Sequence, residues 1–235
     1  MKLISINETY LDYLRENGDP RIPHVDYGIG KIKPFFVLFD LNEDVSYISQ
    51  LSSYKSRHHR MHDQLDFHKI WTDENRCRAV VNLNYMFPIL KTNYFELNRE
   101  DIKRIKENGT MSEAEISDYM EMLDEESYFI DHSNLGDCAK RLYELKKDRP
   151  GHAISLRSLD FKEMEAKMIE FELAQQHAKD DFSVEFSQEE SSFIISDSNG
   201  NRFIYQKSVL EDVNGLFQQV DQAIQANQKE VNFEK

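Results

Sequence analysis

The chain has 235 residues, of which 40% are hydrophobic, and it contains 15 phenylalanines and 11 tyrosines. This composition excludes a disordered chain and predicts one sizeable core, or a domain of roughly 150–170 residues with an appendage. The net charge of −14 argues against a protein that coats nucleic acid over its whole surface.

The first half of the chain predicts one helix and a series of short strands. Residues 1–6 alternate weakly, and Asn7 is a suitable N-cap for a helix over residues 8–16, which Gly18 and Pro20 end. Strands are predicted over residues 35–41, 45–51, 67–72, 76–83, 86–89 and 93–97, the first two as a hairpin. Strands this short, joined by tight polar turns, are typical of a small antiparallel β-barrel or a strongly bent sheet.

Helices predominate in the second half, so we predict an α+β fold. Helical patterns cover residues 98–107, 131–148 and 158–176, and Ser112 with Glu115 predicts a capping box at the start of another helix. The Met and Phe residues of 158–176 are expected to be core. Beyond these helices, a hairpin over 192–196 and 202–205 and a helix over 208–228 are predicted.

The change in composition near residue 176 predicts two parts. Residues 1–175 form the main domain, and residues 176–235 form an acidic β-β-α appendage with 5 basic and 11 acidic residues. Its role is open, and we expect it to contact another protomer or to keep RNA off the rest of the surface. Only two cysteines are present, Cys77 and Cys138, and no apolar run approaches the roughly 18 residues of a membrane span. We therefore expect a cytoplasmic protein without disulfides or membrane attachment.

Positive charge is concentrated in one short segment of the first half. Residues 51–100 carry 8 basic and 6 acidic residues, whereas residues 151–200 carry 4 and 11. Residues 54–62 contain no acidic residue, and Ser52 and Ser53 precede them at a strand end. Short hydroxyl donors followed by fixed cations suit a phosphate group, although a polar turn is the alternative reading. The cations and imidazoles of this segment are Lys55, Arg57, His58, His59, Arg60 and His62.

Three other kinds of site are disfavoured by missing partners. No Gly-x-Ser-x-Gly motif or orienting carboxylate accompanies the serines, which argues against a hydrolytic triad. His58 and His62 have helical i, i+4 spacing, but no HExxH motif or nearby ligand set supports a metal site. Residues 27–31 (YGIGK) lack the Walker A and dinucleotide-binding patterns. We expect neither a metal nor a cofactor.

Four motifs occur in an order that resembles one known family. They are Tyr10-x2-Tyr13-Leu14, Tyr27…Lys33-x-Phe35, Tyr47-x3-Leu51-Ser52-Ser53-x-Lys55 and Val81-Asn82-Leu83-x2-Met86-x-Pro88-Ile89. Together they resemble the ToxN/AbiQ endoribonuclease toxins of type III toxin–antitoxin systems, over about residues 3–90 and more loosely to about 175. The chain departs from that family at Gln50, where a proline is common, and in residues 176–235, which have no counterpart.

The resemblance implies a fold and a reaction. The fold would be a Kid/MazF-like, SH3-like barrel elaborated with helices. The reaction would be metal-independent cleavage of RNA to 2′,3′-cyclic phosphate and 5′-hydroxyl ends. A small repetitive pseudoknot RNA would act as antitoxin within a higher-order protein–RNA assembly, and the biological role would be phage defence.

The resemblance also assigns residues. It places Ser52, Ser53, Lys55, Tyr10 and Lys33 at the catalytic centre, with Lys55 stabilising charge and the serines donating to a phosphate oxygen. Tyr10 and Tyr27 would stack on bases or position the leaving group. Further RNA contacts are predicted for Lys31, Arg57, His58, His59 and Arg60. Two alternatives remain: a MazF-like ribonuclease with a protein antitoxin, and a non-catalytic RNA-binding protein.

Overall fold

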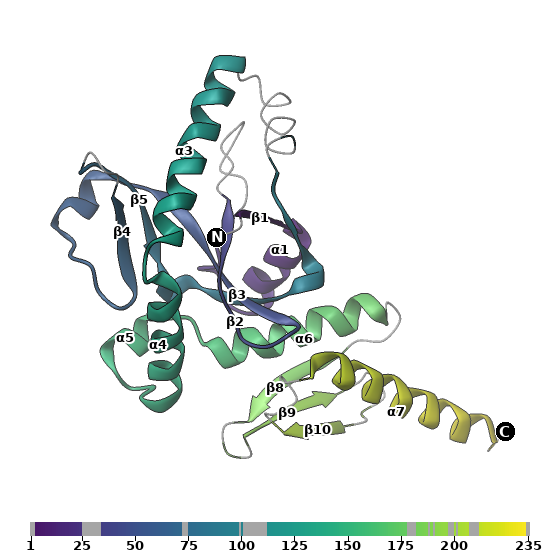
Figure 1. Ribbon diagram of the computed structural model, residues 1–235. Coiled ribbons are helices and arrows are strands. Elements are labelled where there is room, and N and C mark those ends of the chain that lie inside the picture. Colours follow the sequence, from purple (N-terminus) through teal and green to yellow (C-terminus); the bar gives the residue numbers. More distant parts are fainter. Residues whose placement is uncertain are drawn as a thin grey trace.

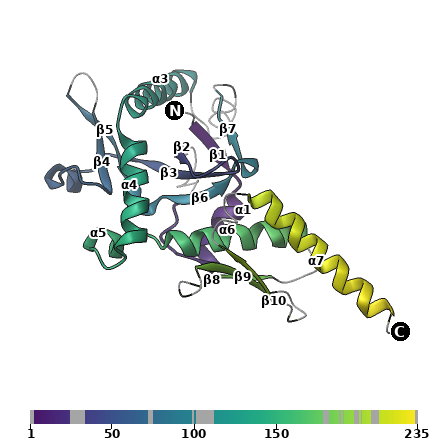
Figure 2. The ribbon, with the colours of Figure 1, turned by 60° about the horizontal axis from the view of Figure 1, so that its bottom comes forward.

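The computed structural model is a mixed α/β structure in which an antiparallel sheet lies between helices (Figure 1). In the view of Figure 2, helix α3 lies above the sheet and helices α1 and α6 lie below it. The residues that the structure describes are 3–24, 34–71, 75–98, 100, 112–177, 182–187, 189, 191–196, 200, 202–206 and 212–233. None of the described helices combines the length and the apolar character that a membrane crossing requires.

The N-terminal elements match their predicted positions. Strand β1 (Leu3–Ile6) is followed by α1 (Glu8–Asn17), whose N-cap Asn7 accepts a hydrogen bond from the Thr9 amide at 3.0 Å. Gly18 follows α1 where the chain passes close to helix α6 (Phe161–Gln176). A Cβ atom at this position would lie 2.9 Å from the backbone oxygen of Leu14 and 2.6 Å from the flexible end of Met164, so glycine avoids a close contact with the last turn of α1.

The main sheet has β3 (Val45–Ser53) at its centre. One edge of β3 pairs with β2 (Phe35–Asp40), and β1 and β7 (Tyr94–Glu96) continue the sheet on that side. The other edge pairs first with β6 (Phe87–Leu90) and then, from Leu51 to Ser53, with β5 (Cys77–Asn82). Beyond β5 lies β4 (Phe67–Trp71) at the end of the sheet.

The predicted antiparallel strands are confirmed, and of the two predicted forms, a small barrel or a strongly bent sheet, the barrel is wrong. The strand order is β4-β5-β3-β2-β1-β7, and no pairing among the described residues joins β4 to β7. Because β3 exchanges β6 for β5 along one edge, the strands on that edge form two groups. The sheet is open, and β4 is left as an edge strand (Figure 1).

Helix α3 (Glu113–Asp131) begins at the predicted capping box, and α4 (Leu135–Asp148) begins four residues after the predicted start at 131 and ends at the predicted residue 148. The predicted capping box is confirmed, since the Ser112 amide donates to Glu115 Oε2 at 2.8 Å and Ser112 Oγ accepts from the Glu115 amide at 3.4 Å. The helix predicted over 98–107 lies almost wholly outside the described residues. Shorter elements are η1 (Ser56–Arg60), η2 (Leu83–Tyr85), η3 (Lys91–Asn93) and α5 (Ala153–Arg157).

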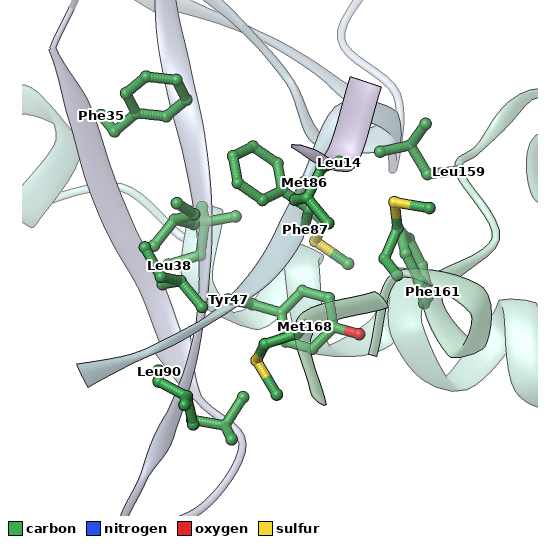
Figure 3. Packing of buried hydrophobic residues seen from close by; sticks show 14 of the residues in the cluster. Leu14, Phe35, Leu38, Tyr47, Met86, Phe87, Leu90, Leu159, Phe161 and Met168 are labelled. Atoms are coloured by element: carbon green, nitrogen blue, oxygen red, sulfur yellow. The ribbon is translucent and has the colours of Figure 1, made fainter. Parts of the chain in front are cut away.

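A buried polar cluster ties β3 to the helices. The Tyr47 side chain passes through the hydrophobic core toward α6, beside Phe161 and Met168 (Figure 3). Its hydroxyl donates to Glu165 Oε1 at 2.8 Å, and the Tyr143 hydroxyl donates to the same oxygen at 2.7 Å. Lys162 forms an ion pair with the other oxygen of Glu165. Because this fully buried carboxylate has three partners, the cluster holds β3 in a defined position over α6.

The C-terminal elements are β8 (Ser183–Ser187), β9 (Ser192–Ser196), β10 (Arg202–Gln206) and α7 (Val213–Phe233). The predicted β9–β10 hairpin is confirmed, but β8 was not predicted because only Val184 and Phe186 alternate within an acidic stretch. Val184, Phe193 and Ile195 belong to the same buried cluster as α6. The change of domain at residue 176 stays a prediction, although α6 does end there.

Candidate active site

The end of β3 presents two adjacent hydroxyls. Ser52 is paired with Val80 and Ser53 with Ala79, both on β5. Successive side chains of a strand point to opposite faces, so the two hydroxyls can approach one ligand only where the strand ends. Ser53 is the last residue of β3 and is exposed, whereas Ser52 is half-buried. Ser53 is therefore the more accessible donor.

A turn rich in cations follows these serines directly. Lys55 has an extended backbone (φ −128°, ψ 157°), and the 3-10 helix η1 begins at the next residue. We name residues Lys55–Arg60 the cationic turn. Lys55, Arg57, His59 and Arg60 are exposed. In the described part of the chain, no carboxylate lies within ion-pair distance of Lys55, Arg57 or Arg60. Their charges are therefore available to an anionic ligand.

His58 differs from its neighbours because it points inward. It is only 3% exposed, and its ring lies between those of Tyr54 and Phe67, at centroid distances of 5.8 and 5.9 Å. The predicted contact of His58 with RNA is therefore wrong, since its ring is covered. Its Nδ1 accepts a hydrogen bond from the Lys55 backbone amide at 3.0 Å. The His58 amide in turn donates to the Lys55 carbonyl at 2.8 Å. These two hydrogen bonds resemble a capping box in which histidine takes the place of glutamate, and they fix the backbone of Lys55.

The environment of His58 favours its neutral form. Burial, followed by the charges of Arg57, Lys55 and Lys69, lowers the pKa of His58. Its Nε2 lies 3.0 Å from Arg57 Nε. A neutral imidazole has a single acceptor nitrogen, so it accepts from the Lys55 amide or from Arg57, but not from both at once.

Tyr10 lies in the core and not at the site. It is 0% exposed, its hydroxyl donates to the Pro88 carbonyl at 2.7 Å, and its ring packs on Phe171 with centroids 5.1 Å apart. Burial raises the pKa of Tyr10 well above its usual range. The predicted stacking of Tyr10 on a base is wrong, because none of its ring surface is open. Its hydroxyl instead links α1 to β6.

Tyr27, Lys31 and Lys33 lie outside the described residues, but the residues that flank them are held at β3. Gln50 Nε2 donates to the His24 carbonyl at 2.6 Å, and the Leu51 amide donates to the Pro34 carbonyl at 3.4 Å. The chain therefore leaves and rejoins the described structure beside the strand that ends in Ser53. Gln50, which departs from the resembled family, supplies one of these two links.

Lys69 on β4 also belongs to this region, although sequence reasoning missed it. Lys69 is paired with Val80, and Val80 is paired with Ser52, so the three residues form one row across β4, β5 and β3. Cross-strand neighbours in such a row share a face of the sheet. Alternation of Phe67, Lys69 and Trp71 could have indicated one face of a strand, but the pairing order β3-β5-β4 was not available from the sequence.

These residues can bind and stabilise negative charge. The exposed hydroxyl of Ser53 and cations without a described carboxylate partner lie at one edge, which suits the oxygens of a phosphodiester. In the described chain, neither a carboxylate nor an imidazole hydrogen-bonds the Ser53 hydroxyl, so a serine triad is not assembled. The described residues also contain no cluster of three or more His, Cys, Asp or Glu side chains that could hold a metal.

Comparison with known proteins identifies similar proteins over most of the chain. The family model for toxin ToxN of type III toxin–antitoxin systems matches residues 2–169. No curated protein matches the chain. A solved structure from work on bacterial type III systems, on selective toxin inhibition by a non-coding RNA pseudoknot, shares 20% identity and a TM-score of 0.57. The alignment covers 73% of this chain and 97% of that chain.

Two further solved structures have the same fold. One, described as a bacterial antiviral system regulated by a processed non-coding RNA, shares 22% identity and a TM-score of 0.56, covering 72% of this chain and 97% of that one. The other is the lactococcal anti-phage endoribonuclease AbiQ, with 14% identity, a TM-score of 0.51 and coverages of 73% and 97%. Each alignment leaves about a quarter of this chain unmatched. The family model ends within α6, ahead of β8–β10 and α7.

Proposed function

The chain belongs to the ToxN family of toxins from type III toxin–antitoxin systems, and on that basis we propose that it is a metal-independent endoribonuclease. The observation that carries the proposal is the end of β3, where exposed Ser53 is followed by Lys55, Arg57 and Arg60, three cations with no carboxylate partner among the described residues. In a chain of net charge −14, this local excess of positive charge favours an anionic substrate.

The proposed reaction needs no nucleophile from the protein. The 2′-hydroxyl of RNA attacks the adjacent phosphorus, the bond from phosphorus to the 5′-oxygen breaks, and a 2′,3′-cyclic phosphate and a 5′-hydroxyl form. One proton leaves the 2′-oxygen and one reaches the departing 5′-oxygen. The protein aligns the attacking oxygen and stabilises the charge that accumulates on the phosphate.

The residues at the end of β3 divide this work. Ser53, assisted by Ser52, donates a hydrogen bond to a non-bridging phosphate oxygen, and Lys55 neutralises the dianionic transition state. Lys33, from the segment that starts and ends beside β3, binds a neighbouring phosphate, and Tyr27 and Lys31 contact RNA. Arg57, His59 and Arg60 bind the RNA backbone, because their exposure leaves them open to ligand.

We propose that an RNA antitoxin controls this activity. Toxin inhibition by a non-coding RNA pseudoknot is described for one protein of the same fold, and anti-phage activity for another. By extension, a small repetitive pseudoknot RNA occupies the cationic turn, in a higher-order protein–RNA assembly that serves phage defence in the cytoplasm.

The test is cleavage of RNA in buffer containing EDTA, followed by analysis of the new ends. We expect 2′,3′-cyclic phosphate and 5′-hydroxyl termini from the wild-type protein. Lys55→Ala and Ser53→Ala should each lower the cleavage rate by about 100-fold or more, as is typical when a transition-state donor is removed. Circular dichroism should show both variants folded, because both side chains are exposed.

Matched controls are available on the same protein. Ser117→Ala changes an exposed serine on α3, and Lys140→Ala removes an exposed charge on α4, so both should cleave normally. Full activity of a folded Lys55→Ala variant, or loss of cleavage in EDTA, would rule out the mechanism. Binding of RNA without cleavage would favour a non-catalytic protein. Co-purification with a small acidic protein in place of an RNA would favour a protein antitoxin.

A further inference from the structure

The indole of Trp71 is exposed beside the candidate site. Trp71 is the only tryptophan of the chain, ends the edge strand β4 and is 43% exposed. The ammonium nitrogen of Lys69 lies 5.7 Å from the indole centroid, which is within cation–π distance. A single exposed aromatic residue is common on protein surfaces. Exposure alone therefore assigns no function to Trp71. Its position relative to β3 and the cationic turn distinguishes it from other exposed aromatic residues.

The strand register connects Lys69 to Ser52, and Trp71 is paired with Cys77 beyond a register shift. Lys69, Val80 and Ser52 lie in one row across β4, β5 and β3, which places Lys69 two strand spacings, or roughly 10 Å, from Ser52. Trp71 lies two residues further along β4, and its contact with Lys69 puts both side chains on the same side. Val80 in the middle of this row is fully buried, so RNA can reach Lys69 and Trp71 from the end of β3 only by passing along the ends of β3, β5 and β4.

The charge of Lys69 belongs to the same positive field as the cationic turn. Lys69 joins Arg57 and Lys55 among the cations whose charges act on His58. As with Lys55, no described carboxylate lies within ion-pair distance of the Lys69 ammonium group. Arg78 on β5 differs, because its guanidinium lies 3.4 Å from Glu125 of α3. Lys69 is thus the cation of β4 and β5 that remains available for a phosphate.

We infer that Trp71 and Lys69 form a base-stacking subsite for single-stranded RNA at the β4 edge of the sheet. A base stacks on the open part of the indole while Lys69 contacts a flanking phosphate, and the strand continues past the end of β5 to the end of β3, where Ser53 and Lys55 lie. Single strands are commonly bound in this way, because every base has a face for stacking and every nucleotide has a charge. The inference rests on the proposed function, which it extends by naming where the RNA beside the cleaved bond lies.

The single tryptophan makes the subsite directly observable. RNA carrying 2′-O-methyl groups throughout lacks the attacking hydroxyl and can be titrated while Trp71 fluorescence is recorded. We expect saturable quenching by such a single strand. Binding measured by anisotropy of a labelled copy should weaken about ten-fold or more for Trp71→Ala. Trp71→Phe should bind almost normally, because it keeps an aromatic face, and this variant also guards against an effect of misfolding.

Phe95→Ala is the matched control, since Phe95 is a 71% exposed aromatic residue on β7, at the opposite end of the strand order. It should bind like the wild type. Unchanged affinity of Trp71→Ala in a protein that still cleaves RNA would overturn the subsite and leave the proposed function intact. A wild-type protein that neither binds nor cleaves RNA would overturn both. Comparing the single strand with a folded pseudoknot RNA shows whether substrate, antitoxin or both use the subsite.

Discussion

At the scale of single residues, His58 and its neighbours show why residue type alone could not assign roles within the cationic turn. His58 and His59 are adjacent and chemically identical, yet the first is buried against Phe67 and the second is exposed. Sequence reasoning selected the right segment because its charge contrasts with that of the whole chain. It could not separate the two imidazoles, because a 3-10 turn directs one of them under the sheet edge and the other into solvent.

The buried imidazole predicts a dependence on pH. The pKa of His58 in the folded protein lies below the usual value of about 6.5, so its stabilising contribution is complete above that pH and is lost as the pH falls. His58→Ala should lower the free energy of unfolding by about 1 kcal/mol and slow RNA cleavage, because the Lys55 amide loses its acceptor. Asparagine, with an oxygen near the position of Nδ1, should restore both properties and remove the decline below pH 6.5.

The measurement is thermal denaturation and RNA cleavage between pH 5 and pH 8. His59→Asn is the control, since that side chain is exposed and should leave both profiles unchanged. The contrary result is a His58→Ala variant that keeps the wild-type cleavage rate and the wild-type decline below pH 6.5. That result would show that the hydrogen bond from the Lys55 amide to His58 does not position Lys55.

At the scale of elements, helix α3, which contacts β4 and forms an ion pair with Arg78 of β5, contains a buried carboxyl group. Glu126 is 6% exposed, and burial raises its pKa to about 7 despite the opposing charge of Arg78. Burial likewise raises the pKa of Tyr119 on the same helix to about 12, and the charge of Glu126 adds to that shift. The helix was predictable from its capping box. The buried acid was not, because its burial depends on which face of α3 contacts the sheet.

Ionisation of Glu126 therefore makes the stability of the protein depend on pH in a second way, opposite in sign to the effect of His58. The unfolded carboxyl ionises near pH 4.5 but the folded one near pH 7, so the folded state loses stability as the pH rises between these values. Glu126→Gln should be more stable than the wild type at pH 8, by up to ~3 kcal/mol, and similar to it at pH 4.5. Urea denaturation at the two pH values tests this, with Glu125→Gln, a more exposed neighbour, as control. Equal shifts at both values would exclude ionisation of Glu126 as the cause.

For the strands too, pairings set by a local sequence pattern were predictable, and pairings set by tertiary contacts were not. The hairpin of β2 and β3 was predicted because polar turn residues separate two apolar runs. The pairing of β3 with both β6 and β5 was not, since it joins residues more than 25 positions apart in the sequence. That pairing decided between an open sheet and a barrel, and it also brought Lys69 into line with Ser52.

At the scale of the whole molecule, residues beyond 176 share the core of the rest. Val184, Phe193, Val213 and Leu216 are each at most 1% exposed and belong to the same cluster as α6. The Val184 amide also donates to the buried carboxylate of Glu170 at 2.6 Å. The role expected from composition, contact with another protomer or exclusion of RNA, stays a prediction. The described contacts add a structural role, since β8 covers α6.

Deletion of residues 177–235 should therefore destabilise the protein and promote aggregation, because it exposes the apolar face of α6. As a milder test, Val184→Ala should lower the free energy of unfolding by about 2 kcal/mol. Ile204→Ala, on the 55% exposed Ile204 of β10, should change it by less than about 0.5 kcal/mol. Chemical denaturation measures all three. A truncated protein with wild-type stability would show that these residues are dispensable for the fold.

The hydrogen bond from Tyr47 to Glu165 has a consequence for the timing of toxicity during synthesis. Ser53 and Lys55 leave the ribosome early, but β3 is completed only when β5 and β6 have followed, and its anchor on α6 lies 118 residues after Tyr47. A nascent chain shorter than about 165 residues thus carries the proposed catalytic side chains without the contacts that hold them. We expect such chains to be inactive, so that a translating ribosome is protected from the enzyme it is making until nearly three quarters of the chain has emerged.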